Sequence, residues 1–246
     1  MGKRMTGTVR SVARLADGVY DLRVEAGLTN PAPGRFVHLA VPGFPLRRPI
    51  SLCGCENGVA RLVFAVKGGG TAAMAAWRPG DTVDLLGALG NGFPEPDGGA
   101  GKTVLVGGGI GLPPLLYYAK THPDTHCIAG FRSAGHVILA GEFPSLELCT
   151  DDGSAGFSSY PHQRLEELLK NREPVARVLA CGPEPLLKAT AKVCREFGTP
   201  CFVSAEERMG CGVGACLVCV CAAGGTYKRV CKDGPVFDAA EWGETV

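Results

Sequence analysis

Short segments rich in apolar or β-branched residues alternate with turns over the first 93 residues of the chain. The turn at Asn57-Gly58 is the strongest hairpin signal, because a type I′ turn needs a positive φ angle at both central positions. Short antiparallel strands joined by such turns can close into a small barrel, which leaves no exposed sheet edge. We therefore predict strands at residues 8–13, 19–24, 35–41, 49–55, 59–66 and 82–86.

The pattern changes after a turn-rich linker at residues 94–102, because apolar strands now alternate with helical segments. Strands that alternate with helices form a parallel sheet with crossover connections. Strands are predicted at residues 102–106, 126–131, 145–150, 177–181 and 201–204, and helices at residues 113–120, 165–170 and 185–197.

The last part of the chain, residues 205–246, is rich in cysteine and glycine and is too short to build a core unaided. It needs a bound inorganic centre or a neighbouring surface. The predicted fold class is therefore β plus α/β. We expect an antiparallel barrel at residues 1–95, a parallel-sheet nucleotide-binding domain at residues 96–204 and a small C-terminal subdomain at residues 205–246.

The composition is that of an ordinary globular protein, with 46% hydrophobic residues, 20% charged residues and a formal net charge of +1. The sequence contains no basic stripe that could neutralise phosphates, so nucleic acid is not an expected partner. No segment reaches the length of a membrane helix, and the first residues lack the apolar stretch of a signal peptide. We expect a cytoplasmic protein without membrane contact, in which thiols stay reduced.

Five of the 12 cysteines fall between residues 211 and 231. Their C-x4-C-x2-C opening is typical of a plant-type [2Fe-2S] loop, in which four thiolates hold two irons. Glycines at positions 212 and 214 let the backbone curl around a cluster and direct amide N–H groups at its sulfurs. A structural zinc site or an accidental group of cysteines are the alternatives, although zinc sites usually pair two short knuckles. The predicted metal ligands are Cys211, Cys216, Cys219 and Cys231, with Cys221 as a spare.

A glycine-rich turn lies between a strand and a helix at residues 104–116. Unhindered backbone N–H groups and the positive end of a helix would meet an anionic pyrophosphate there, although the strict G-x-G-x-x-G spacing is not kept. Two further motifs, TDDGSAGF at residues 150–157 and ACGPEPLL at residues 180–187, also follow strands. All three lie at carboxyl ends of strands, where open α/β sheets bind ligands.

Two more motifs lie in the predicted barrel, LRRPIS at residues 46–51 and FAVKGGGT at residues 64–71. An Arg followed within three residues by a Ser can place a guanidinium on a diphosphate and a hydroxyl near a flavin ring nitrogen. The GGGT segment leads into an alanine-rich helix predicted at residues 72–77, so its amides and hydroxyl could meet a phosphate. Either motif alone could be an ordinary loop.

The order of these motifs, from R-P-I-S to the cysteine loop, resembles that of the electron-transfer subunits of NAD-dependent (class B) dihydroorotate dehydrogenases. These belong to the ferredoxin–NADP reductase superfamily. The resemblance covers essentially the whole chain and implies a Greek-key FAD barrel, an NAD-binding α/β domain and a [2Fe-2S] tail. It also implies an FMN-containing catalytic partner, in a complex with two copies of each chain. Electrons from dihydroorotate would pass through the cluster and FAD to NAD⁺, a step of pyrimidine biosynthesis.

The same resemblance assigns roles to individual residues. Ser51 would tune the flavin, and no residue of this chain is expected to act as a base on dihydroorotate. The FAD residues would be Arg48, Pro49, Ile50, Ser51, Val63, Phe64, Ala65, Gly70 and Thr71. The NAD residues would be Gly107, Gly108, Gly109, Gly111, Asp151, Asp152, Gly182 and Pro183.

Two other functions fit the same motifs. One is the small flavin and [2Fe-2S] subunit of an NADH-dependent ferredoxin–NADP reductase or of a sulfhydrogenase. The other is a non-catalytic redox sensor that carries a cluster. The choice between NAD and NADP also stays open, because Arg132-Ser133 after the second strand of the α/β domain could hold a 2′-phosphate.

Overall fold

The computed structural model of the chain describes residues 2–96, 98 and 100–243. Asp97 and Gly99, which belong to the expected linker, lie outside the described residues. Met1, the first residue of the expected barrel segment, and residues 244–246, the last of the expected tail segment, also lie outside the described residues.

The first part of the chain forms the expected closed antiparallel barrel, with the strands in the order β1-β2-β5-β4-β3-β6. Leucines fill its interior, since alternate side chains of each strand point inward. β1 begins earlier than predicted because residues 3–7 pair with β6 alone, and a single apolar side chain among them, Met5, gives no alternating signal. The strands are β1 (Lys3–Ala16), β2 (Val19–Glu25), β3 (Phe36–Leu39), β4 (Arg48–Glu56), β5 (Val59–Ala65) and β6 (Thr82–Leu89).

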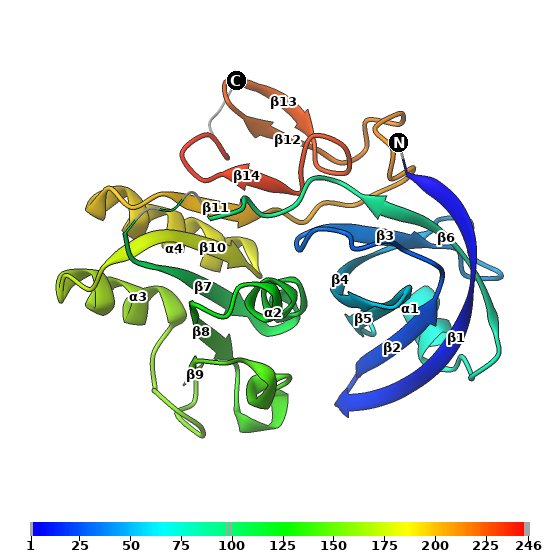
Figure 1. Cartoon of the computed structure of the whole chain (residues 1–246), viewed down its shortest axis with the longest axis horizontal. Coiled ribbons are helices and arrows are strands. Elements are labelled where there is room, and N and C mark those ends of the chain that lie inside the picture. The colour runs from blue at the N-terminus through cyan, green and yellow to red at the C-terminus, as the bar shows by residue number, and fades with distance from the viewer. Residues whose placement is uncertain (1, 97, 99, 244–246) are drawn as a thin grey trace.

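The second part is a sheet in the order β14-β11-β10-β7-β8-β9, in which all strands but β14 are parallel. α2 (Leu112–Thr121) covers the face toward the barrel, and α3 (Pro161–Lys170) and α4 (Glu184–Phe197) cover the other face (Figure 1). The strands are β7 (Lys102–Gly108), β8 (Thr125–Phe131), β9 (Leu146–Thr150), β10 (Val175–Cys181), β11 (Cys201–Ser204) and β14 (Val236–Asp238).

The C-terminal tail adds the edge strand of this sheet, which the sequence did not predict. β14 pairs antiparallel with β11, the strand expected to be the last. Its three residues are too few to show a period in the sequence. The Asn91 side chain fixes this strand to the end of the barrel, because it donates to the Val236 carbonyl (2.7 Å) and accepts from the Val236 amide (2.9 Å). The tail also contains a hairpin of β12 (Val220–Ala223) and β13 (Thr226–Arg229).

The three parts share apolar cores. Cys53, Val63 and Phe93 of the barrel pack with residues of β7 and α2. Phe36 and Leu89 on the outside of the barrel pack with cysteines of the tail. Figure 1 shows the tail, orange to red, lying along the same end of the barrel and the sheet. None of the helices among the described residues has the length and apolar character needed to cross a bilayer.

Candidate functional site

The two flavin motifs meet where β4 begins. The Arg48 guanidinium lies 5.4 Å above the centre of the Phe44 ring, and its Nη1 donates to the Leu46 carbonyl (2.6 Å). A Cβ atom at Gly70 would lie 2.2 Å from Arg48 Nε. The guanidinium of Arg48 therefore fills the space that a side chain at position 70 would need. The structure thus brings the R-P-I-S motif of β4 and the G-G-G-T motif at residues 68–71 together. Pro49, Ile50 and Ser51 follow Arg48 along β4 and are all half-buried.

The Thr71 hydroxyl has a local role in the helix α1 (Gly69–Ala75). It accepts from the amides of Lys67 (2.8 Å) and Gly68 (3.2 Å) and donates to the Gly68 carbonyl (3.0 Å). Such hydroxyl bonds stabilise the first turn of a helix, which is why α1 begins before the predicted position 72. The hydroxyl expected to bind a phosphate is thus already bonded within the chain.

The β5 segment expected to line the flavin is mostly covered. Val63 packs in the core between barrel and sheet, and Phe64 packs inside the barrel against Tyr20. Ala65, at the end of the strand, stays half-buried. Of this segment, Ala65 is the residue whose side chain the structure leaves partly accessible.

The glycine turn and the C-G-P motif pack against each other at the carboxyl ends of β7 and β10. A Cβ atom at Gly111 would lie 2.2 Å from the Cys181 carbonyl oxygen, and one at Gly182 would lie 3.0 Å from the Gly108 amide. At Gly109, with φ at +50°, an added Cβ would meet nothing within 4 Å. The predicted nucleotide residues of these two strands therefore form one edge with open space in front of it. Gly107 packs on Leu112, and Gly108 packs on Pro183.

Asp151 and Asp152 lie along the same edge, after β9, with β8 between β9 and β7. The Asp152 carboxylate accepts from the Ser154 hydroxyl (2.6 Å) and amide (3.0 Å), and these bonds lower its pKa. Asp152 thus orders its own loop as an exposed carboxylate, two strands away from the glycine turn.

The four predicted cluster ligands lie together in the tail as two neighbouring pairs. Cys211 lies beside Cys216, and the Cys231 amide donates to the Cys219 sulfur (3.4 Å). The amides of Val213 (3.4 Å) and Ala215 (3.2 Å) donate to Cys211 Sγ. The amide of Gly214 donates to Cys231 Sγ (3.1 Å). Gly212 and Gly214 have φ angles of +72° and +82°, which allow this curl and which side chains disfavour.

This arrangement fits a two-iron cluster. A tetrahedral zinc site needs its ligands to converge on one point. The four thiols lie instead as two pairs, Cys211 with Cys216 and Cys219 with Cys231. Two adjacent pairs suit a [2Fe-2S] group, in which two thiolates ligate each iron. Cys221 lies on β12 opposite Lys228, and burial raises its pKa.

The thiols differ in how readily they lose a proton. Burial acts to raise the pKa of Cys211, but hydrogen bonds from the amides of Val213, Cys216 and Ala215 outweigh it and lower the pKa to about 6. Burial raises the pKa of Cys231 to about 12. Binding of a metal would displace the remaining protons, because the thiolate is the ligand.

His38 on β3 was not identified from the sequence, yet it lies directly against this loop. Its side chain is fully buried, neither ring nitrogen has a well-aligned hydrogen bond among the described residues, and the backbone of Cys211 and Arg47 lies close to the ring. A Cβ atom at Gly212 would lie 2.5 Å from His38 Nδ1. Burial lowers the pKa of His38 to about 4. The backbone of Cys211 has the opposite, smaller effect and acts to raise this pKa. A polar residue inside the apolar run F-V-H-L was the available signal.

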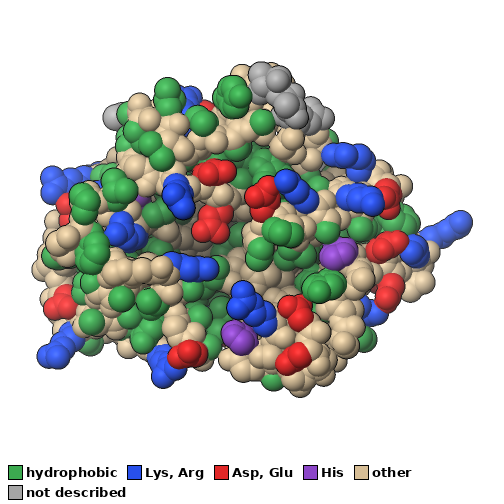
Figure 2. All heavy atoms as spheres, turned by 180° about the vertical axis from the view of Figure 1, so that it is seen from behind, with side chains coloured by type: hydrophobic (Ala, Val, Ile, Leu, Met, Phe, Trp, Pro, Cys, Tyr) green, Lys and Arg blue, Asp and Glu red, His purple; other side chains and the backbone are tan. Residues whose placement is uncertain are grey.

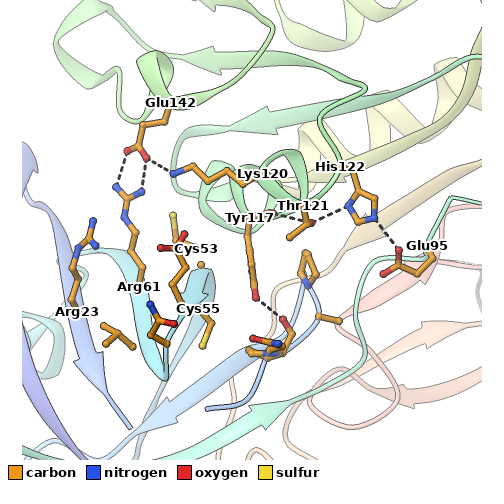
Figure 3. A pocket seen from close by; sticks show the side chains of 18 residues that line it. Arg23, Cys53, Cys55, Arg61, Glu95, Tyr117, Lys120, Thr121, His122 and Glu142 are labelled. Atoms are coloured by element: carbon orange, nitrogen blue, oxygen red, sulfur yellow. Dashed lines mark hydrogen bonds and ion pairs between the residues drawn. The ribbon is translucent and has the colours of Figure 1, made fainter. Parts of the chain in front are cut away.

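A pocket of about 930 Å³ lies elsewhere, between the β4–β5 hairpin and the end of α2, and contains none of the predicted site residues (Figure 3). Arg61 of β5 donates to Glu142 through both terminal nitrogens (2.6 and 2.7 Å), and Lys120 of α2 also donates to Glu142 (2.7 Å). Figure 3 shows these side chains joined across one end of the pocket. They connect the barrel with the sheet domain.

Comparison with known proteins identifies the family to which the chain belongs. Residues 206–242 match the family described as the iron-sulfur cluster binding domain of dihydroorotate dehydrogenase B. The dihydroorotate dehydrogenase B (NAD(+)) electron transfer subunit of Bacillus caldolyticus is 42% identical, over 95% of this chain and 96% of that protein. The subunit of the same name from Clostridium perfringens is 35% identical over 96% of each chain.

Solved structures show the same fold. A chain from the structure of an NADH-dependent reduced ferredoxin-NADP oxidoreductase aligns with a TM-score of 0.85 and 28% identity, covering 96% of this chain and 89% of that one. Phthalate dioxygenase reductase aligns with a TM-score of 0.66 at 18% identity, covering 91% of this chain and 87% of the other. From the near-complete matches at 35–42% identity, the chain belongs to the family of dihydroorotate dehydrogenase B (NAD(+)) electron transfer subunits.

Proposed function

We propose that this chain carries electrons from a dihydroorotate-oxidising, FMN-containing catalytic subunit to NAD⁺, through a [2Fe-2S] cluster and FAD. In the balanced reaction, dihydroorotate and NAD⁺ give orotate, NADH and a proton. The observation that carries the proposal is the pairing of four thiols next to the barrel, with three amides of the same loop directed at their sulfurs.

When bound, the cluster supplies one-electron transfer, and FAD supplies the exchange between single electrons and a hydride. The chain's own residues hold and orient these groups. Cys211, Cys216, Cys219 and Cys231 would bind the irons as thiolates. The loop amides that now donate to sulfur would stabilise the added negative charge of a reduced cluster, since hydrogen bonds to sulfur raise its reduction potential.

For FAD, we assign the diphosphate to Arg48 and to the backbone beside Gly70. A guanidinium gives charge-assisted, bidentate hydrogen bonds to phosphate. The Thr71 hydroxyl is bonded to the Lys67 and Gly68 backbone, so its part is to hold this turn in shape. Pro49, Ile50 and Ser51 would border the flavin, with the Ser51 hydroxyl as a hydrogen-bond partner that tunes it. In β5, the half-buried Ala65 is the side chain that would contact the flavin. The buried Val63 and Phe64 would hold this strand in place.

For NAD, we assign the diphosphate to the turn from Gly107 to Gly111, where backbone N–H groups can approach an anion without steric hindrance. Gly182 and Pro183 would border the nicotinamide end, because they pack on this turn. Asp151 and Asp152, farther along the edge, would face the ribose of the adenosine half, and an aspartate there favours a free 2′-hydroxyl over a phosphate. This assignment favours NAD over NADP.

The surface around Cys216 suits a partner protein. Leu217 and Val218 beside it and Tyr227 in β13 are 61%, 56% and 68% exposed. Contiguous exposed apolar groups mark interaction sites. We assign this face to the catalytic subunit, in a complex with two copies of each chain in the cytoplasm. Figure 2 shows acidic and basic side chains interspersed on one face of the molecule.

A small subunit of an NADH-dependent ferredoxin–NADP reductase is the second candidate, because the chain from that enzyme matches with a TM-score of 0.85. Its 28% identity is lower than the 42% shared with the Bacillus caldolyticus subunit.

The test is reconstitution. The anaerobically purified chain would be loaded with FAD and iron and mixed with an FMN-containing dihydroorotate dehydrogenase subunit, dihydroorotate and NAD⁺. We expect NADH to form only when both subunits are present. A fully loaded chain that binds the partner but forms no NADH would exclude the proposed function. NADPH formation coupled to ferredoxin would favour the second candidate.

A further inference from the structure

The peptide group between Gly214 and Ala215 connects a cysteine sulfur with a charged side chain of the tail hairpin. Its N–H, which belongs to Ala215, donates to Cys211 Sγ (3.2 Å). Its carbonyl, which belongs to Gly214, accepts from Arg229 Nη1 (3.4 Å). A trans peptide group is planar, and its N–H and C=O bonds point in opposite directions. A contact that fixes the carbonyl therefore also fixes the direction of the N–H toward the sulfur.

The rest of the Arg229 guanidinium is held by Asp233, two positions after the predicted ligand Cys231. Arg229 Nε (2.8 Å) and Nη2 (2.9 Å) donate to the two carboxylate oxygens, and the Arg229 backbone amide also donates to this carboxylate (2.8 Å). Both side chains are half-buried. Because a guanidinium is a rigid planar fork, this bidentate pair directs Nη1 away from the carboxylate and toward Gly214.

The turn at Gly214 serves both pairs of thiols. Its own amide donates to Cys231 Sγ (3.1 Å), so the peptide groups before and after Gly214 direct N–H groups at one sulfur of each pair. Gly214 has a φ angle of +82°, and a Cβ atom there would lie 2.7 Å from Lys232 Cδ. A side chain at this position is thus excluded, and the contact from Arg229 anchors the turn instead.

We propose that Arg229 is a positioning residue for the iron–sulfur site: its guanidinium holds the peptide between Gly214 and Ala215 so that the N–H of this peptide stays directed at Cys211 Sγ. The inference rests on the proposed function. A donor at the carbonyl also polarises the peptide and strengthens its N–H as a donor. Hydrogen bonds to sulfur raise the reduction potential of a cluster, since they stabilise the added electron. Arg229 itself exchanges no proton and no electron.

The experiment measures the cluster rather than turnover. Wild type, Arg229→Gln, Arg229→Lys and the control Lys228→Gln would be purified anaerobically as full chains. Iron content, the EPR spectrum of the reduced protein and the midpoint potential of the cluster would be recorded. Lysine keeps the positive charge and can keep the ion pair with Asp233, but it lacks the second arm that reaches Gly214. Lys228→Gln removes one positive charge at the neighbouring position of β13 and so measures the effect of charge alone.

We expect Arg229→Gln to lower the midpoint potential by about 59 mV, which is about tenfold in a one-electron equilibrium, and to change the EPR line shape. Arg229→Lys should keep its iron and show at least about half of this shift, because the charge stays while the contact with the Gly214 carbonyl is lost. Lys228→Gln should match wild type. If Arg229→Gln alone fails to bind iron, a lowered potential in Arg229→Lys still supports the inference.

Three results would overturn the inference. The first is an iron-replete Arg229→Gln or Arg229→Lys protein with the potential and spectrum of wild type. The second is loss of iron from Arg229→Lys, which would indicate that the guanidinium only supports the fold of the tail. The third is an equal shift in Lys228→Gln, which would indicate an effect of charge alone. A wild-type chain without iron–sulfur signals would instead remove the proposed function itself.

Discussion

Gly70 and Gly212 show how a missing side chain can define a site. Each glycine stands where a Cβ would collide with a polar side chain from the barrel, Arg48 Nε at 2.2 Å and His38 Nδ1 at 2.5 Å. Gly212 also has a positive φ angle, which only glycine adopts at little cost. The two positions therefore fix where a cation and an imidazole can lie.

The glycine at position 70 can be tested directly. Gly70→Ala should displace the Arg48 guanidinium and weaken FAD binding by about tenfold or more, since a charge-assisted hydrogen bond contributes about 1.5–3 kcal/mol. FAD affinity would be measured by fluorescence titration of the flavin-free protein. Gly68→Ala is the matched control, because a Cβ there meets nothing within 4 Å and its φ of 176° suits any residue. Equal effects of both variants would contradict the assignment of Arg48.

The cysteine ligands can be separated from the spare in the same way. Cys216→Ser should lose most of the iron and the visible cluster absorption, because a thiolate is removed from one of the two pairs. Cys221→Ser should keep both, since Cys221 lies on β12 outside the pairs. Iron analysis of anaerobically purified proteins measures the difference. Full iron in Cys216→Ser, or loss of iron in Cys221→Ser, would reverse the ligand assignment.

Individual residues could be identified from the sequence when chemistry imposes a spacing on them. The intervals between Cys211, Cys216, Cys219 and Cys231 are such a case, and the structure brings these four together. His38 has no motif, and its position against the cysteine loop brings together segments more than 170 positions apart. The bonding of the Thr71 hydroxyl to its own turn was likewise not visible, because the same sequence could cap a helix or bind a phosphate.

At the scale of elements, the sequence predicted strands and helices with a clear period and missed those formed by pairing. β11 was predicted with its observed bounds, and α2 and α4 within a residue or two. The first residues of β1 and the three residues of β14 are strands only because β6 and β11 lie beside them. Tertiary pairing of this kind leaves no periodic signal.

The short helix η3 (Ala140–Glu142) provides a contact between domains that propensity could not reveal. Glu142→Gln should reduce the stability of the folded chain by about 1 kcal/mol at pH 7, because Lys120 loses its charged partner and Arg61 keeps only Asp21, while partial exposure limits the effect. Urea unfolding would measure it. Glu166→Gln, which removes an exposed pair with Lys170 on α3, is the control and should change stability less. Equal losses in the two variants would show that the contact between domains adds nothing.

The same pair predicts a dependence on pH. Hydrogen bonds from Arg61 lower the pKa of Glu142 to about 2, below the value of about 4.3 for an unfolded chain. A lowered pKa contributes stability that is complete above the unfolded value and is lost as the pH falls toward the folded value. The stability difference between wild type and Glu142→Gln should therefore be largest above about pH 5 and should shrink toward pH 2. If the stability difference between the two proteins stayed constant between pH 7 and pH 3, it would not come from the ionised Glu142 carboxylate.

In the whole molecule, the three parts depend on each other to different degrees. The barrel and the sheet share a large core through α2, whereas the tail has a small one in which Cys219 and Cys231 are themselves members. β14 is held by β11 and by Asn91. The segment between β11 and β14 therefore has few apolar contacts beyond those around the cysteines. A bound cluster would contribute most of the free energy that keeps this segment folded.

Removal of the cluster should accordingly loosen this segment and little else. We expect limited proteolysis of the chelator-treated protein to cut between residues 206 and 235, where the cysteine loop and the β12–β13 hairpin lie. The barrel and the sheet up to β11 should resist, since their cores contain no metal ligand. Mass spectrometry of the fragments would locate the cuts, and Cys216→Ser without chelator should give the same pattern. Cuts spread over all three parts would show that the cluster supports the whole fold, and resistance throughout would show that the tail folds without it.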